Sequence, residues 1–220
     1  MIGLTPLDTS TVQKNRSGGT LNTSNASVNL IGWVAVATGV SGMLGLTFII
    51  LFFTVGQPFG TLNDIFIGLT AILSMVLVWM LYPGYHAQFP LLSKIAFVIA
   101  MVGAILVLVG TALAISGAKG WFLSGLYMAA GNAMIGLWLL VLCTSAMRGN
   151  SLPQNLVIFG LISGVILALG LVTIPGIFRG IDSQEYKFTL FNSIWWASSL
   201  GYLALYPIWA ILLGRMLLHK

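Results

Sequence analysis

The sequence predicts an all-α polytopic membrane protein, a bundle of six transmembrane helices, and three observations lead to this fold class. The 220 residues contain six long apolar stretches, none of which carries a charged residue near its middle. Hydrophobic residues make up 58% of the chain and charged residues 6%, whereas a soluble domain carries about 25% charged residues. The connections between the stretches are short, which leaves no room for a soluble catalytic domain.

Each apolar stretch is long enough to cross a bilayer as a helix. A helix rises about 1.5 Å per residue, so about 20 residues cross the ~30 Å of hydrocarbon. Lipid offers no partner to backbone N–H and C=O groups, and an α-helix pairs these groups within itself. The predicted spans are 30–55, 61–82, 91–116, 121–147, 155–178 and 190–214.

The chain divides into residues 1–28, predicted to be a flexible polar cytoplasmic tail, and residues 29–220, the six-helix transmembrane domain. The first segment is rich in Thr, Ser, Asn and Gly and has too little apolar surface to offset the entropy of ordering it. It also lacks the basic and then apolar order of a cleavable signal peptide. We therefore expect the first span to act as the insertion signal.

The distribution of Lys and Arg predicts the orientation. One side of the membrane would hold six of these residues: Lys14, Arg16, Lys94, Arg148, Arg215 and Lys220. The other side would hold three: Lys119, Arg179 and Lys187. The positive-inside rule then places both termini in the cytoplasm. Glycan-acceptor triplets at Asn15, Asn22 and Asn25 would favour an outside N-terminus, but triplets of this kind arise by composition in so polar a segment.

Tyr and Trp residues near the span ends predict two interfacial belts, because amphipathic rings prefer the depth of the lipid headgroups. The cytoplasmic belt would contain Trp33, Trp79, Tyr82, Tyr85, Tyr206 and Trp209. The opposite belt would contain Trp121, Trp195 and Trp196.

Asp64 is the only acidic residue within or next to a predicted span. Thr61 and Asp64 have the spacing of a capping box, which favours a structural cap at the start of the second span. The alternative is a cation or proton site at the mouth of a cavity, since an ionisable residue at membrane depth is a functional candidate. Asn63, Thr70 and Ser74 continue down one helical face and support this alternative.

Asn132 is the most central strongly polar residue, eleven residues into the fourth span and so roughly 16 Å deep. Its amide predicts either packing between helices or a ligand site. Trp138 would lie near the bilayer midplane, where it either fills a gap or forms one wall of a pocket. With Tyr127 and Met128, these residues offer apolar walls and one polar anchor for a lipid, a quinone or a carotenoid-like pigment.

The fifth span carries a ladder of small residues, Gly160, Gly164 and Ala168, which predicts close helix packing and a face that can accept a partner helix. Pro175 and Pro207 should kink the fifth and sixth spans, because proline lacks a backbone donor and clashes with the preceding turn.

The remaining chemistry argues against an enzyme. His86 and His219 lie outside the spans, so a histidine-ligated haem within the bundle and a histidine-based metal site are not expected. A pair of catalytic carboxylates would have to join Asp64 to Asp182 or Glu185, and their spacing does not suggest a pair.

Three stretches together resemble uncharacterised six-span bacterial membrane proteins of a domain-of-unknown-function type. They are the segment 58–64 (PFGTLND), the run 120–138 (GWFLSGLY continuing to GNAMIGLW) and the segment 205–215 (LYPIWAILLGR). The resemblance implies a six-helix bundle in a bacterial cytoplasmic membrane, and it transfers no activity or functional residue.

The sequence therefore favours a non-enzymatic integral membrane protein, an accessory or scaffolding subunit that contacts the lipid bilayer and other membrane subunits or itself. Such a subunit could hold a lipid, quinone or pigment, and nothing in the sequence suggests nucleic-acid binding. The alternative is a small transporter or channel for a cation or compact polar solute.

Overall fold

The computed structural model describes residues 17–86, 89–182 and 189–219, with side chains from residue 26 and, after the second gap, from residue 192. These residues form helices and short connections, and no strand occurs among them. In order the elements are α1 Ser17–Val55, α2 Phe59–His86, α3 Pro90–Ser116, α4 Trp121–Arg148, α5 Gln154–Ala168, η2 Leu169–Thr173, α6 Ile174–Phe178, α7 Thr189–Leu200, η3 Gly201–Leu205 and α8 Tyr206–Leu218.

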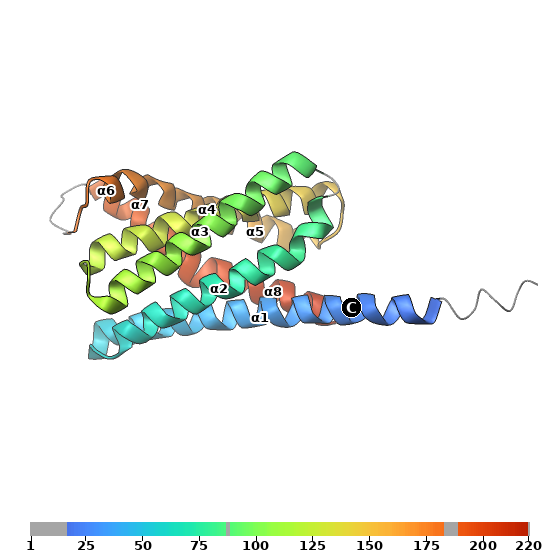
Figure 1. Cartoon of the computed structure of the whole chain (residues 1–220), viewed down its shortest axis with the longest axis horizontal. Helices are drawn as coiled ribbons and strands as arrows, with labels where there is room; N and C mark the ends of the chain where they lie inside the picture. The colour runs from blue at the N-terminus through green and yellow to red at the C-terminus, as the bar shows by residue number, and fades with distance from the viewer. Residues whose placement is uncertain (1–16, 87–88, 183–188, 220) are drawn as a thin grey trace, which may run out of the picture.

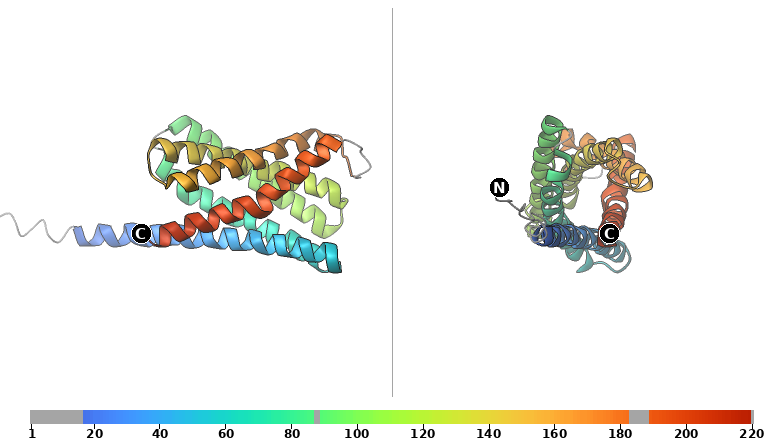
Figure 2. Two further views of the ribbon diagram at one scale, coloured as in Figure 1. Left: turned by 180° about the vertical axis from the view of Figure 1, so that it is seen from behind. Right: turned by 90° about the vertical axis from the view of Figure 1, so that its right-hand side faces the viewer.

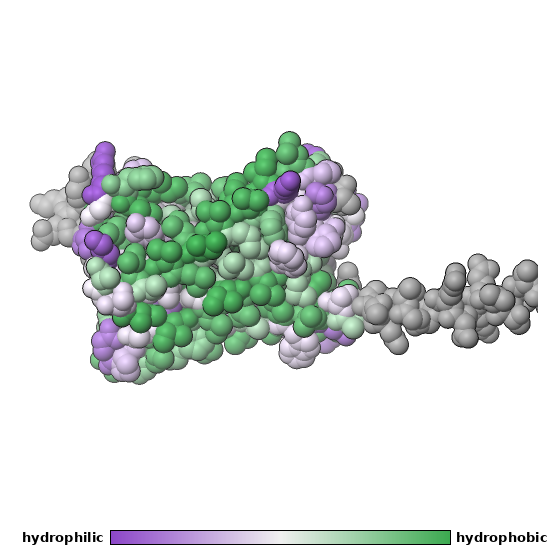
Figure 3. All heavy atoms as spheres, viewed as in Figure 1, coloured by the Kyte–Doolittle hydropathy of each residue, from purple (hydrophilic) through white to green (hydrophobic). Residues whose placement is uncertain are grey.

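Six helical segments of the described chain are long and apolar enough to cross a membrane, which confirms the predicted fold class. Two of the spans are composite: α5, η2 and α6 form the fifth, and α7, η3 and α8 form the sixth. The surface in Figure 3 is apolar along the bundle, and hydrophilic residues gather at its two ends. The protein is therefore an integral, multi-pass membrane protein.

The first helix begins before its membrane span. It starts at Ser17, so residues 17–28, expected to belong to the tail, continue the helix. The N-terminal part of α1 projects beyond the bundle (Figures 1 and 2). Residues 1–16 lie outside the described residues, and their flexibility stays a prediction.

The spans pack in a ring. Helices α1 to α5 pack in chain order, and α8 closes the ring by packing against α1 (Figure 2). Because the number of spans is even, the start of α1 and the end of α8 lie at the same end of the bundle, here called the terminal end. The connections 56–58 and 117–120 lie at the opposite end, here called the distal end.

Helix α4 is the most buried span: 72% of its most apolar 18 residues are buried, against 33–39% in the other spans. Its close approach to α3 depends on glycine. A Cβ added to Gly131 would meet the backbone oxygen of Gly103 and the side chain of Val107. Backbones at this distance gain van der Waals contact, which drives helix association in lipid.

The predicted ladder of small residues packs inside the chain. Gly160 faces Cys143 of α4 and Trp209 of α8, and Gly164 faces the side chain of Leu140 and the backbone of Gly136 on α4. These residues pack helices as predicted, but against helices of the same chain. The expectation of a free face for a partner helix is therefore wrong at Gly160 and Gly164, and Ala168 is half-buried.

Both predicted kinks coincide with irregular helix. The 3₁₀ segment η2 ends two residues before Pro175, which lies at the start of α6. The π-helical segment η3 ends two residues before Pro207, which lies at the start of α8. In each case the missing proline N–H and the crowded carbonyl four residues earlier disfavour a regular α-turn.

Candidate functional site

A vestibule of about 610 Å³ lies at the distal end of the bundle. It is bounded by the end of α1, the starts of α2 and α4, the end of α3, and α7. A narrower cavity of about 40 Å³ shares Phe53, Asn63, Asp64, Trp121 and Trp196 with the vestibule. About 10–15 Å³ of such space holds one water molecule, so the cavity has room for a few.

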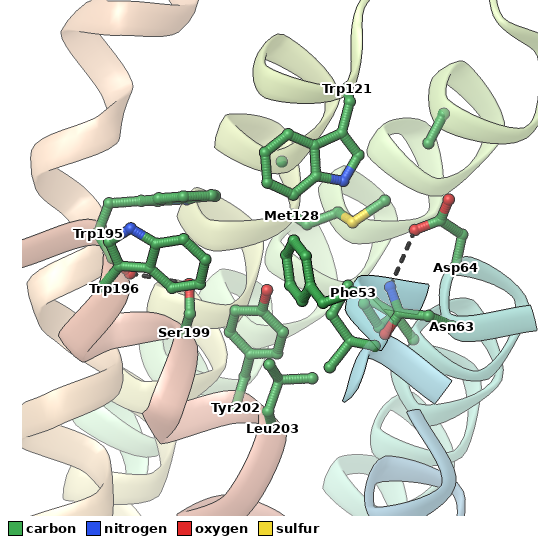
Figure 4. Close-up of a pocket in the computed structure, with 14 residues that line it drawn as sticks. Phe53, Asn63, Asp64, Trp121, Met128, Trp195, Trp196, Ser199, Tyr202 and Leu203 are labelled. Atoms are coloured by element: carbon green, nitrogen blue, oxygen red, sulfur yellow. Dashed lines mark hydrogen bonds between the residues drawn. The ribbon is translucent and has the colours of Figure 1, made fainter. Parts of the chain in front are cut away.

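Asn63 and Asp64 line both the vestibule and the cavity (Figure 4). Their side chains are only 4% and 9% exposed. The Asn63 amide Nδ2 donates to Asp64 Oδ1 at 3.2 Å. The Asp64 carboxylate has no other hydrogen bond and no ion-pair partner among the residues that the structure describes. Its carboxylate is thus nearly buried, uncompensated by a cation, and directed at a cavity.

The capping-box prediction for Asp64 is wrong. Helix α2 begins at Phe59, so Asp64 is the sixth helical residue and lies beyond the first turn. The Thr61 hydroxyl lies 3.4 Å from Gln57 Oε1 and does not cap the helix. Because Asp64 does not cap the helix, its position agrees with the alternative hypothesis, a cation or proton site at a cavity.

Two buried polar atoms at the cavity have no hydrogen-bond partner among the described residues. They are the acceptor Asn63 Oδ1 and the donor Trp195 Nε1. An unpaired buried donor or acceptor costs about 1–3 kcal/mol. Both atoms belong to residues that line the cavity, and each atom is itself buried.

Aromatic rings form the rest of the wall. Figure 4 shows Trp195 and Trp196 across the cavity from Asp64, with Phe53 and Tyr202 between them and Trp121 at one side. The ring centroids of Trp195 and Trp121 are 5.7 Å apart at an interplanar angle of 83°, an edge-to-face contact. The centroids of Trp195 and Trp196 are 4.9 Å apart.

A polar track continues from the cavity toward the middle of the bundle. A deeper cavity of about 10 Å³ is lined by Thr70, Asn132 and Tyr202. The Thr70 hydroxyl lies 3.1 Å from Ser41 Oγ and donates to its own helix at Phe66 O. The stripe predicted on α2, which comprises Asn63, Thr70 and Ser74, is therefore buried along the bundle interior.

A block of large aromatic side chains lies on α8 and α4 next to this track. The Tyr206 hydroxyl donates to Ser74 Oγ at 2.9 Å, and the Tyr206 ring stacks on Trp209 at 6.1 Å. Trp209 meets Trp138 edge to face at 6.5 Å. The Trp138 indole N–H donates to the Tyr85 hydroxyl at 2.8 Å. Tyr85 also lines a cavity of about 150 Å³ near the terminal end.

The four residues expected to share a hydrophobic-ligand pocket are separated. Met128 lines the narrower cavity of about 40 Å³, whereas Asn132 lines the deeper cavity of about 10 Å³. The Asn132 amide donates to Met128 O at 2.9 Å within the same helix. Trp138 is fully buried in the aromatic block, as the gap-filling alternative predicted. Tyr127 packs against the cluster of Phe122 and its neighbours.

Asp182 has a structural role that the sequence did not reveal. Its carboxylate accepts the backbone N–H of Gly120 at 2.8 Å and of Leu123 at 3.2 Å, and so caps the start of α4. Carboxylates stabilise helix N-termini by pairing free N–H groups and by opposing the helix dipole. Glu185 lies outside the described residues.

The sequence pattern predicted an interfacial belt for the cavity tryptophans and did not indicate Phe53 or Tyr202 as site residues. One signal was available: Trp195, Ser199 and Tyr202 are spaced at i, i+4 and i+7, which places them on one helical face. In the belt predicted to be cytoplasmic, Trp33 and Trp79 are exposed as expected, whereas Tyr85, Tyr206 and Trp209 are buried.

Comparisons of the chain with protein-family models, curated proteins and solved structures find no match. The site geometry is thus the basis for a functional proposal.

Proposed function

We propose that the protein is a small transporter or channel for a cation or compact polar solute. The observation that carries the proposal is Asp64, a carboxylate 9% exposed at the floor of the vestibule, with no ion-pair partner among the described residues. A buried charge is costly unless it is paired. An ionisable residue within a membrane span is retained where it contacts an ion, a proton or a polar substrate.

The surrounding polar atoms support the same function. Asn63 and Trp195 line the cavity, and Asn63 Oδ1 and Trp195 Nε1 have no hydrogen-bond partner among the described residues. A polar ligand would satisfy them on binding, whereas a structural core would pair them internally.

The broken sixth span supports transport over static binding. Tyr202 and Leu203, which line both cavities of the track, belong to the π-helical segment η3. Transporter sites are commonly built where helices are discontinuous near the bilayer midplane. In this structure the vestibule is open at the distal end, and the aromatic block with Trp138 and Trp209 fills the interior on the other side.

We further propose that the vestibule opens to the outside of a bacterial cytoplasmic membrane. The excess of Lys and Arg on the terminal side, six residues against three, supports this orientation by the positive-inside rule.

The accessory-subunit role favoured by the sequence was supported by the short loops, the lack of a reactive constellation and the small-residue faces. Of these faces, the ladder at Gly160 and Gly164 is occupied by α4 and α8. Mass measurement after gentle solubilisation tests the role directly: a co-purifying membrane protein in fixed ratio would favour it over transport.

Proteoliposomes test the proposal. The wild-type chain should pass at least one solute of a panel of Na⁺, K⁺, methylammonium and urea faster than empty vesicles. Asp64→Asn should lose this flux, because the uncompensated charge at the vestibule floor is gone. Asp8→Asn is the matched control. It removes the same charge from the N-terminal segment, and the flux should be unchanged. A panel with no flux above empty vesicles would contradict transport, and equal flux in Asp64→Asn would remove Asp64 from the mechanism.

A further inference from the structure

We propose that the substrate of this site is an organic ammonium ion that carries at least one N–H. The inference rests on the proposed function and names its substrate class. Its positive charge would lie between Asp64 and the aromatic wall of the vestibule, and its N–H would donate to Asn63 Oδ1.

The charge of the site selects a cation. Asp64 faces the cavity from α2, and Asn63 beside it adds a buried acceptor, Oδ1, that no described group uses. No cation of the described chain occupies this position. A bound ammonium would supply both the missing countercharge and the missing donor.

The aromatic wall selects an organic cation. Phe53 of α1, Trp121 of α4 and Trp196 of α7 line the same vestibule as Asp64. Trp121 and Trp196 remain 41% and 49% exposed, so their rings are accessible. Both rings contact Trp195, which is buried and fixes their positions. Aromatic faces attract ammonium ions through their quadrupole, and tryptophan does so best.

An inorganic cation fits this wall less well. Calcium takes six to eight oxygen ligands, and magnesium demands near-octahedral oxygen coordination. Among the described residues no three His, Cys, Asp or Glu side chains come together. A single carboxylate, one amide oxygen and several indoles instead suit a weakly hydrated cation with carbon substituents. The vestibule, at about 610 Å³, has room for such an ion.

Binding to the purified full-length protein in nanodiscs tests the inference, with intrinsic tryptophan fluorescence as the readout. The probes are phenethylammonium, its quaternary N,N,N-trimethyl derivative and the neutral 2-phenylethanol. We expect saturable quenching by phenethylammonium, weaker affinity for the quaternary ion because it cannot donate to Asn63, and no saturable binding of the alcohol. If 2-phenylethanol bound with the same affinity as phenethylammonium, the inference would be overturned, because the site would not distinguish a charged ligand from a neutral one.

Variants locate the probe. Asp64→Asn should weaken phenethylammonium binding about tenfold or more, the range for a lost hydrogen bond to a charged group. Trp121→Leu and Trp196→Leu should each weaken it about two- to fivefold, the range for an exposed cation–π contact. Trp33→Leu removes an exposed indole of α1 that does not line the vestibule and should leave affinity unchanged. Gel filtration confirms that each variant is folded, and unchanged affinity in folded Asp64→Asn would overturn the inference.

The two proposals fail separately. Flux of Na⁺ or K⁺ that depends on Asp64, without phenethylammonium binding or competition, would overturn the organic-cation inference and support transport. Asp64-dependent phenethylammonium binding without any flux of that ion would support the binding site and contradict transport.

Discussion

The indole N–H of Trp138 donates to the hydroxyl of Tyr85 at 2.8 Å and so joins α4 to α2 inside the bundle. Both side chains are buried, at 4% exposed for Tyr85 and 0% for Trp138, so the hydrogen bond lies inside the bundle. The pair continues the aromatic block of Tyr206 and Trp209 toward the terminal end, where Tyr85 borders the second cavity.

Tyr85→Phe should destabilise the protein by about 1–3 kcal/mol, because it leaves the buried Trp138 N–H without an acceptor. The apparent melting temperature in detergent measures the loss. Tyr82→Phe, on the same helix and with a half-buried side chain, is the matched control and should change the melting temperature little. Equal melting of Tyr85→Phe and the wild type would show that the hydrogen bond contributes nothing to stability.

Gly131→Ala should destabilise the α3–α4 pair by about 1–3 kcal/mol, the usual range for overpacking a tight contact. The new methyl group would press on the backbone of Gly103, which cannot rotate away as a side chain can. Gly84→Ala is the control, since a Cβ there meets nothing within 4 Å. Thermal unfolding of both variants in the same detergent checks the difference, and a larger loss in Gly84→Ala would refute the packing argument.

Asp182→Ala should lower stability by about 0.5–2 kcal/mol, because the cap of α4 is lost. Asp182→Asn keeps one acceptor oxygen for Gly120 or Leu123 and should lose less. Neither change should abolish flux through a folded protein, since Asp182 acts on the helix terminus. Loss of transport with unchanged melting would instead make Asp182 part of the site.

Asp64→Asn should have the opposite effect on stability. It removes an uncompensated buried charge while keeping an acceptor for the Asn63 amide, so the apparent melting temperature should rise, by an amount equivalent to about 0.5–2 kcal/mol. Substrate flux should fall in the same variant. A stabilised but inactive Asp64→Asn variant would indicate a functional residue. A variant that is both destabilised and inactive would indicate that Asp64 has a structural role.

Orientation can be tested with introduced cysteines. Cys143 is buried and gives little background. Lys119→Cys, at an exposed position of the distal end, should react in intact cells with a maleimide that does not cross the membrane. Arg148→Cys, at the terminal end, should react only after the cells are opened. The reverse labelling pattern would show that the vestibule opens to the cytoplasm.

The spans could be predicted because hydrophobic length is a local property of the sequence. The second span, expected at 61–82, became Phe59–His86, and the small shift at its start decided the role of Asp64. Thr61 and Asp64 have the right spacing for a cap, but spacing does not fix where a helix begins, and the helix begins two residues earlier.

The candidate site could be predicted only in part, because its walls come from five different spans. Asp64 and Asn63 were detectable as polar residues near a span end. The burial of Tyr206 and Trp209 could not be detected in the sequence. Aromatic residues near a helix end have the sequence pattern of interfacial residues, and only the neighbouring helices show that they are covered. The contact of Asp182 with Gly120 joins positions 62 residues apart and leaves no local pattern.

The π-helical segment Gly201–Leu205 also sets the rotational phase of the last span. A π-turn closes its hydrogen bond one residue later than an α-turn, so it holds one extra residue, equivalent to about 100° of rotation. Deleting one residue from this segment would restore a regular helix and turn Tyr206 and Trp209 away from Ser74 and Trp138. The alignment of the vestibule half of this span with the aromatic half therefore depends on a single residue of chain length.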